Sequence, residues 1–249
     1  MTPAAMTMFE RLAPITLDQL VAGASLQTRV DRKYVVTPDQ FEALLERLSG
    51  QAQVLDIDGR RVFEYESVYF DTPALDSYLG AARRRPWRFK VRTRSYLDAE
   101  RCWVEVKLRN RRGQTVKHRH EHDFAERDRI AGTSLAFVDS FPPLRPFTRQ
   151  LEPALVTRYR RSTLAVGSSR ATVDVDVTCA TFDHRIARLD GAVVVETKSD
   201  RSACEVDRAL WALHLRPTTT SKYGIGMAAL HPALPSNKWH RVLDRYVSV

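Results

Sequence analysis

The chain has 249 residues, of which 43% are hydrophobic and 28% charged, so it can bury one substantial core and is not disordered throughout. No run approaches the roughly 18 apolar residues of a membrane span, and the first residues do not form a signal peptide, so we expect a cytoplasmic protein. The three cysteines, Cys102, Cys179 and Cys204, are far apart and form no CxxC pair. Their spacing argues against a disulfide framework and against a zinc knuckle.

The formal net charge is +9, from 39 basic and 30 acidic residues, and arginines outnumber lysines by 32 to 7. Residues 77–97, 108–120 and 153–173 contain sixteen basic residues and no acid, so the rest of the chain carries a net charge of −7. Such a concentrated positive field indicates a polyanionic partner: nucleic acid, an acidic membrane surface or a phosphate-rich small molecule. A solvated surface encoded by a GC-rich genome would give the same excess of arginine, and composition alone leaves both interpretations open.

From the N-terminus onward, short runs of alternating apolar and polar residues predict eight strands. They lie near residues 27–36, 61–70, 86–96, 101–109, 115–123, 154–164, 169–177 and 192–199. Turn residues at 98–100, 112–113, 167–168 and 190–191 separate neighbouring runs and predict hairpins, so the sheet should be largely antiparallel.

Two amphipathic helices are expected to pack on this sheet. Residues 37–40 form a capping box with proline at the first helical position, followed by apolar residues on one face. Ser202 and Glu205 predict a second capping box, before a helix that ends near Pro217. A proline-rich connection at residues 141–153 joins the fifth and sixth strands.

The predicted strands have one apolar face and one face on which nearly every residue is ionisable. In the fourth strand, Val104 and Val106 point one way, while Glu105, Lys107 and Arg109 point the other. A half-buried antiparallel sheet also alternates, but its polar face usually mixes Thr, Ser and Gln with scattered charges. We therefore expect a closed barrel with helices outside and a charged lumen, which would have to hold water, metal and a polyanion.

Six of the seven lysines fit this arrangement. Five lie on the charged side of a predicted strand and one lies in the later segment 221–223: Lys33, Lys90, Lys107, Lys117, Lys198 and Lys222. Lysine is a compact charge that suits one phosphate oxygen in a narrow channel, whereas arginine forks across two. The placement is the one that a phosphate channel requires, and a single sequence leaves chance open as the alternative.

Ordered motifs from about residue 29 to residue 227 resemble the catalytic domain of the vacuolar transporter chaperone (VTC) proteins, in the triphosphate tunnel metalloenzyme or CYTH-like superfamily. The motifs are DRKY at 31–34, VYFDT at 68–72, KVRTRSY at 90–96, WVEVKLR at 103–109, YRR at 159–161, RATVD at 170–174, VETK at 195–198 and SKY at 221–223. Two positions depart from the family pattern. Thr219 stands where a second lysine can occur, and Asp31 stands where glutamate is common.

The resemblance implies an α+β, mainly β fold: an eight-stranded antiparallel closed barrel that forms a triphosphate tunnel, with helices packed on its outside. It implies one domain over residues 1–249, with a core at about 25–230 and short helical extensions at both ends. The implied activity is polyphosphate synthesis from ATP with Mg²⁺ or Mn²⁺ as cofactor. The two departures weaken the expectation of polymerase activity more than that of phosphate binding.

By the same resemblance, Lys107, Arg161, Lys198 and Lys222 take catalytic roles and Glu196 holds the metal. The full set expected to contact phosphate is Lys33, Lys90, Arg92, Arg94, Lys107, Arg109, Lys117, Arg119, Arg161, Arg170, Lys198 and Lys222. Asp174 or Asp176 would help Glu196 to complete an oxygen-rich metal shell.

Phosphoryl transfer is catalysed mainly by positioning and by neutralising charge on the transferring group. The end of a growing polyphosphate chain is already anionic, so transfer of the ATP γ-phosphoryl group to it needs no general base. Hydrolysis of tripolyphosphate or of a nucleoside triphosphate is the enzymatic alternative. It would need a second acidic metal site to activate water, with candidates Asp31, Glu105, Asp174 and Asp176.

The non-enzymatic alternative is a polyphosphate-binding or nucleic-acid-binding module. We expect no nucleic acid, because Trp87 and Phe89 alternate onto the apolar face instead of lying among the basic residues. His118, His120 and His122 alternate on one strand, and placing Lys117 and Arg119 in the lumen puts these histidines outside, which disfavours a metal role for them. Export of a product would need a membrane-protein partner.

Overall fold

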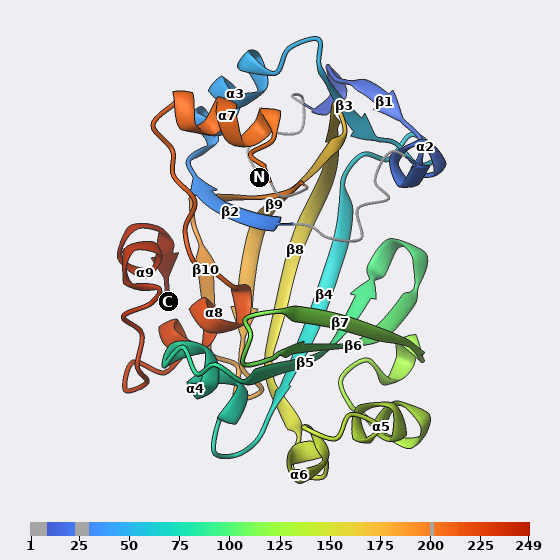
Figure 1. The fold of residues 1–249 in the computed structure, drawn as a ribbon, viewed down its shortest axis with the longest axis vertical. Helices are drawn as coiled ribbons and strands as arrows, with labels where there is room; N and C mark the ends of the chain where they lie inside the picture. Colours follow the sequence, from blue (N-terminus) through green and yellow to red (C-terminus); the bar gives the residue numbers. More distant parts are fainter. Residues whose placement is uncertain (1–8, 23–29, 200–201) are drawn as a thin grey trace. The chain divides into compact units, whose positions relative to one another are not determined.

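The computed structural model describes residues 9–22, 30–199 and 202–249. Residues 27–29 of the first predicted strand lie outside this part. The chain forms two compact units: unit 1 comprises Met1–Phe63, Tyr159–Asp176 and Leu189–Thr219, and unit 2 comprises Glu64–Arg158, Val177–Arg188 and Thr220–Val249. Figure 1 shows the elements of both units. No helix among the described residues is long and apolar enough to cross a membrane.

Unit 1 is a sheet with three helices. The strands are β1 (Ala13–Ile15), β2 (Val30–Val36), β3 (Ala52–Leu55), β11 (Val193–Ser199) and parts of β8 (Glu152–Val166) and β9 (Ser169–Ala180); the helices are α2 (Leu17–Ala22), α3 (Pro38–Arg47) and α7 (Glu205–Ala212). The strand order is β1, β3, β8, β9, β11, β2. Only the short β1–β3 pair is parallel among the recorded pairings, while β3–β8, β9–β11 and β11–β2 are antiparallel.

The apolar face of the unit 1 sheet packs against α3 and α7. Thr37 accepts a hydrogen bond from the Gln40 amide and Gln40 returns one, which is the capping box predicted from the sequence. The buried residues of α3, α7 and the strands form one cluster: Phe41, Leu44, Val206 and Leu210 from the helices, and Tyr34, Val36, Ala171, Val173, Val193 and Val195 from the strands. One-sided burial leaves the alternate strand positions on the opposite, charged face.

Unit 2 is a longer antiparallel sheet. Its strands follow the order β12 (Val247–Ser248), β10 (Ile186–Leu189), β9, β8, β4 (Phe63–Asp71), β5 (Arg88–Tyr96), β6 (Arg101–Arg109) and β7 (Thr115–His122). Its helices are α4 (Asp76–Ala82), α5 (Gly132–Asp139), α6 (Arg145–Thr148), α8 (Lys222–Leu230) and α9 (His240–Tyr246), with 3₁₀ turns at Leu97–Ala99 and Phe124–Glu126. Within the described residues, β12 and β7 are the two edge strands of this order, and they do not pair with each other.

The apolar face of β4, β5 and β6 is covered by residues of α5, α6 and the loops around them. Val91, Val104 and Val106 are fully buried there and pack with Val138 and Leu144. The Trp87 ring stacks on Phe147 at a centroid distance of 6.0 Å, so this aromatic residue packs on the apolar side, as predicted. Helices α5 and α6 therefore lie on the apolar side of these strands, whereas α8 packs on the other side, where its Tyr223 stacks on Tyr69, the residue opposite Arg92.

The predicted fold class is confirmed: the chain is mainly β, its long strands pair antiparallel, and helices α3, α5, α6 and α7 pack on the apolar faces. All eight predicted strands are present, the first of them from Val30 onward. The short strands β1, β3, β10 and β12 were not predicted, because runs of two to four residues carry too little alternation to be recognised.

Two local predictions were wrong. The turn at 190–191 does not make a hairpin, because β10 and β11 both pair with β9, at Thr178–Ala180 and at Arg170–Asp174 respectively. Asp176 has φ 52° and separates these two stretches of β9. The second capping box is not Ser202 and Glu205: α7 begins after Cys204, and Asp207 accepts the Cys204 amide hydrogen bond.

Candidate phosphate-binding site

The charged face of unit 2 is formed by alternate residues of β5, β6 and β7. Residues directly opposite each other in antiparallel strands share a face, so the register gives four rows. The rows are Arg88–Arg109–Thr115, Lys90–Lys107–Lys117, Arg92–Glu105–Arg119 and Arg94–Trp103–Glu121. The sequence placed seven of these eight cations in the phosphate-binding set, and the structure brings all seven together. The eighth, Arg88, was missed, although it is two residues before Lys90 and therefore on the same side.

Glu105 is the acid at the centre of this face and is only 3% exposed. Arg92 donates to Glu105 Oε2 from Nε at 2.9 Å and from Nη2 at 2.6 Å, Arg94 Nε lies 3.8 Å from the same oxygen, and Lys117 forms an ion pair with Oε1. Burial alone would raise the pKa of Glu105, but the three cations hold it far below its usual range. Glu105 is therefore ionised at any physiological pH and neutralises part of the charge around it.

Other cations on this face are only partly paired or are held by aromatic rings. Arg94 Nε is buried and makes no hydrogen bond, since its distance to Glu105 is too long for one. Lys90 Nζ lies 5.7 Å from the ring centre of Tyr69 and 5.8 Å from that of Tyr223, and these two rings stack at 5.0 Å. The Arg94 Nε donor and the Lys90 ammonium group are therefore placed to bind a negatively charged ligand.

Lys222 lies outside the strands, as the first residue of α8. Ser221 caps this helix by accepting the Gly224 amide at 3.0 Å, and Tyr223 donates to Asp71 at 2.5 Å. Asp71 is fully buried and also accepts backbone amides at the start of α4, from Ser77 and Tyr78 among others. Burial raises the pKa of Asp71, and the hydrogen bonds from Tyr223 and the backbone oppose that shift. The closing SKY motif is therefore tied to the YFDT segment through Tyr223 and Asp71.

The charged face of unit 1 carries the proposed metal ligand. The register between β2, β11 and β9 places Glu196 between Lys33 and Thr172, and Lys198 between Asp31 and Arg170. Glu196 lies 3.5 Å from Lys33 Nζ and 3.2 Å from Lys198 Nζ. Burial lowers the pKa of Lys198 to about 8, and the Glu196 carboxylate opposes this shift. Both lysines are therefore adjacent to the one carboxylate expected to hold a metal.

The two other proposed metal ligands contact arginines. Asp174, 2% exposed, accepts from both Nε and Nη2 of Arg161 at 2.5 and 2.8 Å, and Asp176 accepts from Arg160 Nε at 2.7 Å. Among the described residues there is no group of three or more His, Cys, Asp or Glu side chains that could hold a metal ion. The donor chemistry nevertheless fits Mg²⁺ or Mn²⁺, since such ions often use one or two carboxylates with phosphate oxygens and water.

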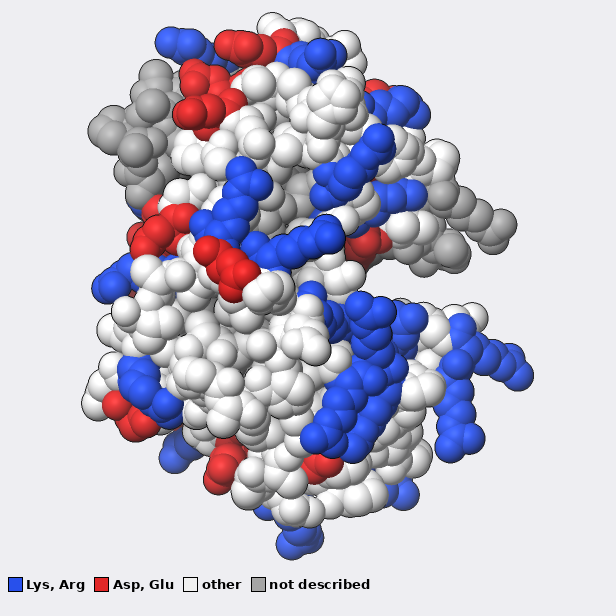
Figure 2. All heavy atoms as spheres, turned by 90° about the vertical axis from the view of Figure 1, so that its left-hand side faces the viewer, with Lys and Arg blue, Asp and Glu red and all other residues white. Residues whose placement is uncertain are grey.

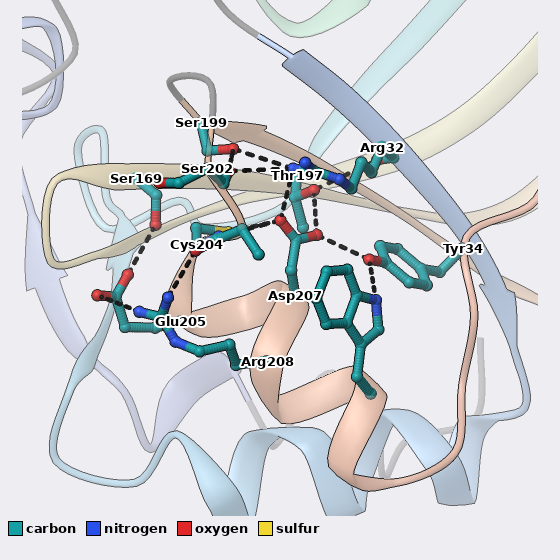
Figure 3. A network of polar contacts seen from close by, with 12 residues as sticks. Arg32, Tyr34, Ser169, Thr197, Ser199, Ser202, Cys204, Glu205, Asp207 and Arg208 are labelled. Atoms are coloured by element: carbon teal, nitrogen blue, oxygen red, sulfur yellow. Dashed lines mark hydrogen bonds and ion pairs between the residues drawn. The ribbon is translucent and has the colours of Figure 1, made fainter.

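A buried polar network supports unit 1 from the apolar side of the sheet (Figure 3). Asp207 of α7 is fully buried and accepts hydrogen bonds from Tyr34 at 2.8 Å, Thr197 at 2.8 Å and Arg32 at 3.0 Å. Burial tends to raise the pKa of Asp207, but the hydrogen bonds from Tyr34 and Thr197 outweigh it and lower the pKa. Tyr34 and Arg32 flank Lys33, and Thr197 lies between Glu196 and Lys198. The network therefore fixes the strands that present the charged side chains.

The histidines of β7 lie on the opposite side from Lys117 and Arg119. His118 and His120 pack against the rings of Phe141 and Phe137, and both nitrogens of His122 are within hydrogen-bond distance of Ser134 Oγ and the Glu126 carbonyl. The predicted placement of the histidines outside the charged face is confirmed.

The three cysteines are free thiols and are buried.

The VTC domain family profile matches residues 28–231, which is most of the chain. The chain belongs to the VTC domain family. A search of curated proteins gave no match.

Among solved structures, this VTC domain is similar to a proposed adenylyl cyclase from Hippeastrum that is described as having a dominant triphosphatase activity. The TM-score is 0.51 at 14% identity, and the alignment covers 85% of this chain and all of the Hippeastrum chain. Proposed adenylate cyclases from Bacillus halodurans and Vibrio parahaemolyticus align with TM-scores of 0.49 and 0.46 at 13% and 15% identity. Each alignment covers 78% of this chain, with 94% and 95% of the other chain. The Hippeastrum likeness shows a shared fold.

Proposed function

We propose that this VTC domain binds triphosphate and polyphosphate on its two charged sheet faces and transfers the ATP γ-phosphoryl group to the end of a polyphosphate chain. The observation that carries the proposal is the charge of the unit 2 face, where eight cations share four rows with only two acids. A face of this kind is costly without anions, because neighbouring cations repel one another. Membership of the VTC domain family supports phosphate chains as those anions.

The roles divide between the two faces. Arg92, Arg94, Lys107 and Lys117 of unit 2 neutralise and orient the phosphate chain, and the unbonded Nε of Arg94 donates to a phosphate oxygen. In unit 1, Lys198 and Arg161 contact the transferring group. Preorganised cations of this kind stabilise charge spread over the equatorial oxygens in phosphoryl transfer.

Glu196 would hold Mg²⁺ or Mn²⁺, which supplies charge neutralisation for the phosphates when bound. Asp174 would join it only by giving up part of its bidentate contact with Arg161. Lys33 and Lys198 lie beside Glu196 and would contact the same phosphates. The chain's own contribution is thus one carboxylate among cations, with the substrate providing the other oxygens.

Transfer to an anionic phosphate fits these residues better than attack by water. The four acids that would build a second metal site have cationic neighbours. Glu105 contacts three cations, Asp174 contacts Arg161 and Asp176 contacts Arg160. Asp31 lies opposite Lys198 in the β2–β11 pair. A polyphosphate end needs no deprotonation, so it reacts without such a site. Tripolyphosphate hydrolysis is the second candidate, favoured by the triphosphatase activity described for the Hippeastrum protein of the same fold.

The test is incubation of the purified protein with ATP and Mn²⁺, followed by gel analysis of the products. The proposal predicts a ladder of polyphosphate chains that is lost in Glu196→Gln and retained in Glu42→Gln, an exposed glutamate of α3. Phosphate release from tripolyphosphate, with no ladder from ATP, would assign hydrolysis instead. Failure to bind either triphosphate would reject both activities.

A further inference from the structure

One corner of unit 2 carries cations to which the roles proposed above assign no phosphate group. It consists of Arg84, Arg88, Arg109 and Lys238, and we call it the basic corner. Arg88 and Arg109 face each other across β5 and β6 and form the last row of the charged face. Arg84 follows α4, and Lys238 precedes α9. Four cations thus come from four separate segments of the chain.

The geometry of the basic corner is fixed by contacts to α4 and α8. Lys238 Nζ donates to the Ala81 carbonyl at 2.9 Å, and Arg88 Nη1 donates to the Arg85 carbonyl at 2.7 Å. Trp239, next to Lys238, is 2% exposed and packs so closely on α8 that a Cβ at Gly224 would overlap its ring. The close packing of Trp239 limits where the neighbouring Lys238 can move.

The basic corner has no acid to balance it, unlike the row that contains Glu105. Within the described part of the chain, Arg84, Arg88, Arg109 and Lys238 form no ion pair with Asp or Glu. The pKa of Lys238 is lowered to about 8, first by burial and then by the positive charges of Arg88, Arg84 and Arg109. Figure 2 shows Lys and Arg side chains gathered into a dense patch in its lower half. Mutual repulsion of this kind is relieved when an anion binds.

The surroundings of the basic corner favour a phosphate chain over nucleic acid. Single-stranded nucleic acid usually stacks its bases on exposed aromatic rings. Trp239 is buried, and Trp87, one residue before Arg88, packs against Phe89 and Phe147 on the apolar side. The corner therefore offers charge and hydrogen-bond donors without a stacking surface.

We propose that the basic corner binds phosphate groups of a long polyphosphate chain beyond those held by Arg92, Arg94, Lys107 and Lys117 on the same face, so that unit 2 favours long chains over tripolyphosphate. This inference assumes the phosphate binding proposed above. Successive rows on one face are about 7 Å apart, so the four rows extend for roughly 20 Å. A triphosphate is shorter than this and leaves the basic corner uncovered, whereas a long chain covers every row.

The experiment compares binding of long-chain polyphosphate and of tripolyphosphate to the full chain by competition against a labelled polyphosphate. The test variant is Arg84→Gln/Lys238→Gln, which leaves the four rows of the charged face unchanged, and Arg84→Gln alone is a second, exposed substitution. The matched control is Arg47→Gln/Arg149→Gln, which removes the same charge at two exposed positions. Melting temperatures of all variants establish that they fold.

We expect the test variant to bind long-chain polyphosphate at least about tenfold more weakly and tripolyphosphate within about twofold of the wild type. Arg84→Gln should weaken only the long chain, and the control should change neither. Equal weakening of both ligands, or of neither, would overturn the proposal for the basic corner while leaving phosphate binding by the domain intact. Equal weakening of a single-stranded DNA oligonucleotide would overturn the choice of polyphosphate. No binding of tripolyphosphate by the wild type would instead reject the proposed function.

Discussion

The charged faces of the two units come from the same alternation of residues but differ in their balance of charge. In unit 1, Lys33, Lys198, Arg170 and Arg161 share the face with Asp31, Glu196 and Asp174. In unit 2, eight cations share the face with Glu105 and Glu121. A face with similar numbers of cations and acids can hold a carboxylate that binds a metal ion. A face with an excess of cations instead stabilises bound anions. The unit 1 face therefore suits a metal ion with its phosphate ligands, and the unit 2 face suits a phosphate chain.

The units also differ in how their buried acids are supported. Asp207 of unit 1 lies behind the charged face and accepts hydrogen bonds from strands β2 and β11. Glu105 of unit 2 lies within the charged face and contacts three of its cations. Asp207, behind the charged face, therefore fixes the strands. Glu105, within the charged face, sets how much positive charge remains for a ligand.

The largest effect is expected from Glu105→Gln, because it leaves Arg92, Arg94 and Lys117 together without their shared carboxylate. Removing one partner of a buried ion pair typically costs roughly 3–5 kcal/mol, so the free energy of unfolding in urea should fall by about that amount. Glu121→Gln on the same face should cost less than about 0.5 kcal/mol, because Glu121 is exposed and pairs only with exposed Arg101. Equal unfolding free energies for the two variants would show that Glu105 does not balance the unit 2 face.

A smaller change in stability but a large loss of turnover is expected from Glu196→Gln in unit 1. Removing the one carboxylate placed to hold the metal should lower turnover of ATP by roughly 100-fold. Binding of tripolyphosphate without metal should stay within severalfold of the wild type, since Lys33 and Lys198 remain. Steady-state kinetics and calorimetry measure the two quantities. Unchanged turnover would place the metal, or the chemistry, away from unit 1.

The smallest effect concerns the pH dependence of Lys238 in unit 2. Its pKa of about 8 in the folded chain lies below that of an exposed lysine, about 10.4. The unfolded chain therefore binds more protons between these values, so the contribution of Lys238 to stability should increase as pH rises through this window. Binding of long-chain polyphosphate should weaken over the same window as Lys238 loses its charge beside Arg84, Arg88 and Arg109.

Comparison with Lys238→Gln isolates this effect. The wild type should gain melting temperature relative to the variant as pH rises from about 8 to about 10, and its preference for long-chain polyphosphate should fall toward that of the variant. A constant difference between the two proteins over this range would show that Lys238 does not titrate within the basic corner.

Much of the fold followed from local sequence patterns. Alternation placed Lys117 and Arg119 on one face of β7 and His118 and His120 on the other, and the register confirms this arrangement. The capping box at Thr37 marked the start of α3 correctly. These features are determined by neighbours within a few residues, so the sequence alone suffices to predict them.

Features that depend on distant segments were not predictable. Nothing near Lys238 in the sequence indicates that it lies beside Ala81, since the chain between them contains most of unit 2. Alternation showed that Asp174 lies on a charged face but not that Arg161 holds both of its oxygens. The pairing of β10 and β11 with the same strand likewise required the topology, because the turn at 190–191 has the composition of a hairpin.

The most direct test of the account is tripolyphosphate binding, measured by calorimetry, in one lysine variant from each face. Lys107→Gln removes a cation from unit 2 and Lys198→Gln removes one from unit 1, with Arg47→Gln as the exposed control. The account predicts that both site variants bind about tenfold or more weakly, since a hydrogen bond to a charged group contributes roughly 1.5–3 kcal/mol, and that the control binds like the wild type. Wild-type affinity in both Lys107→Gln and Lys198→Gln would contradict the claim that the charged faces bind phosphate.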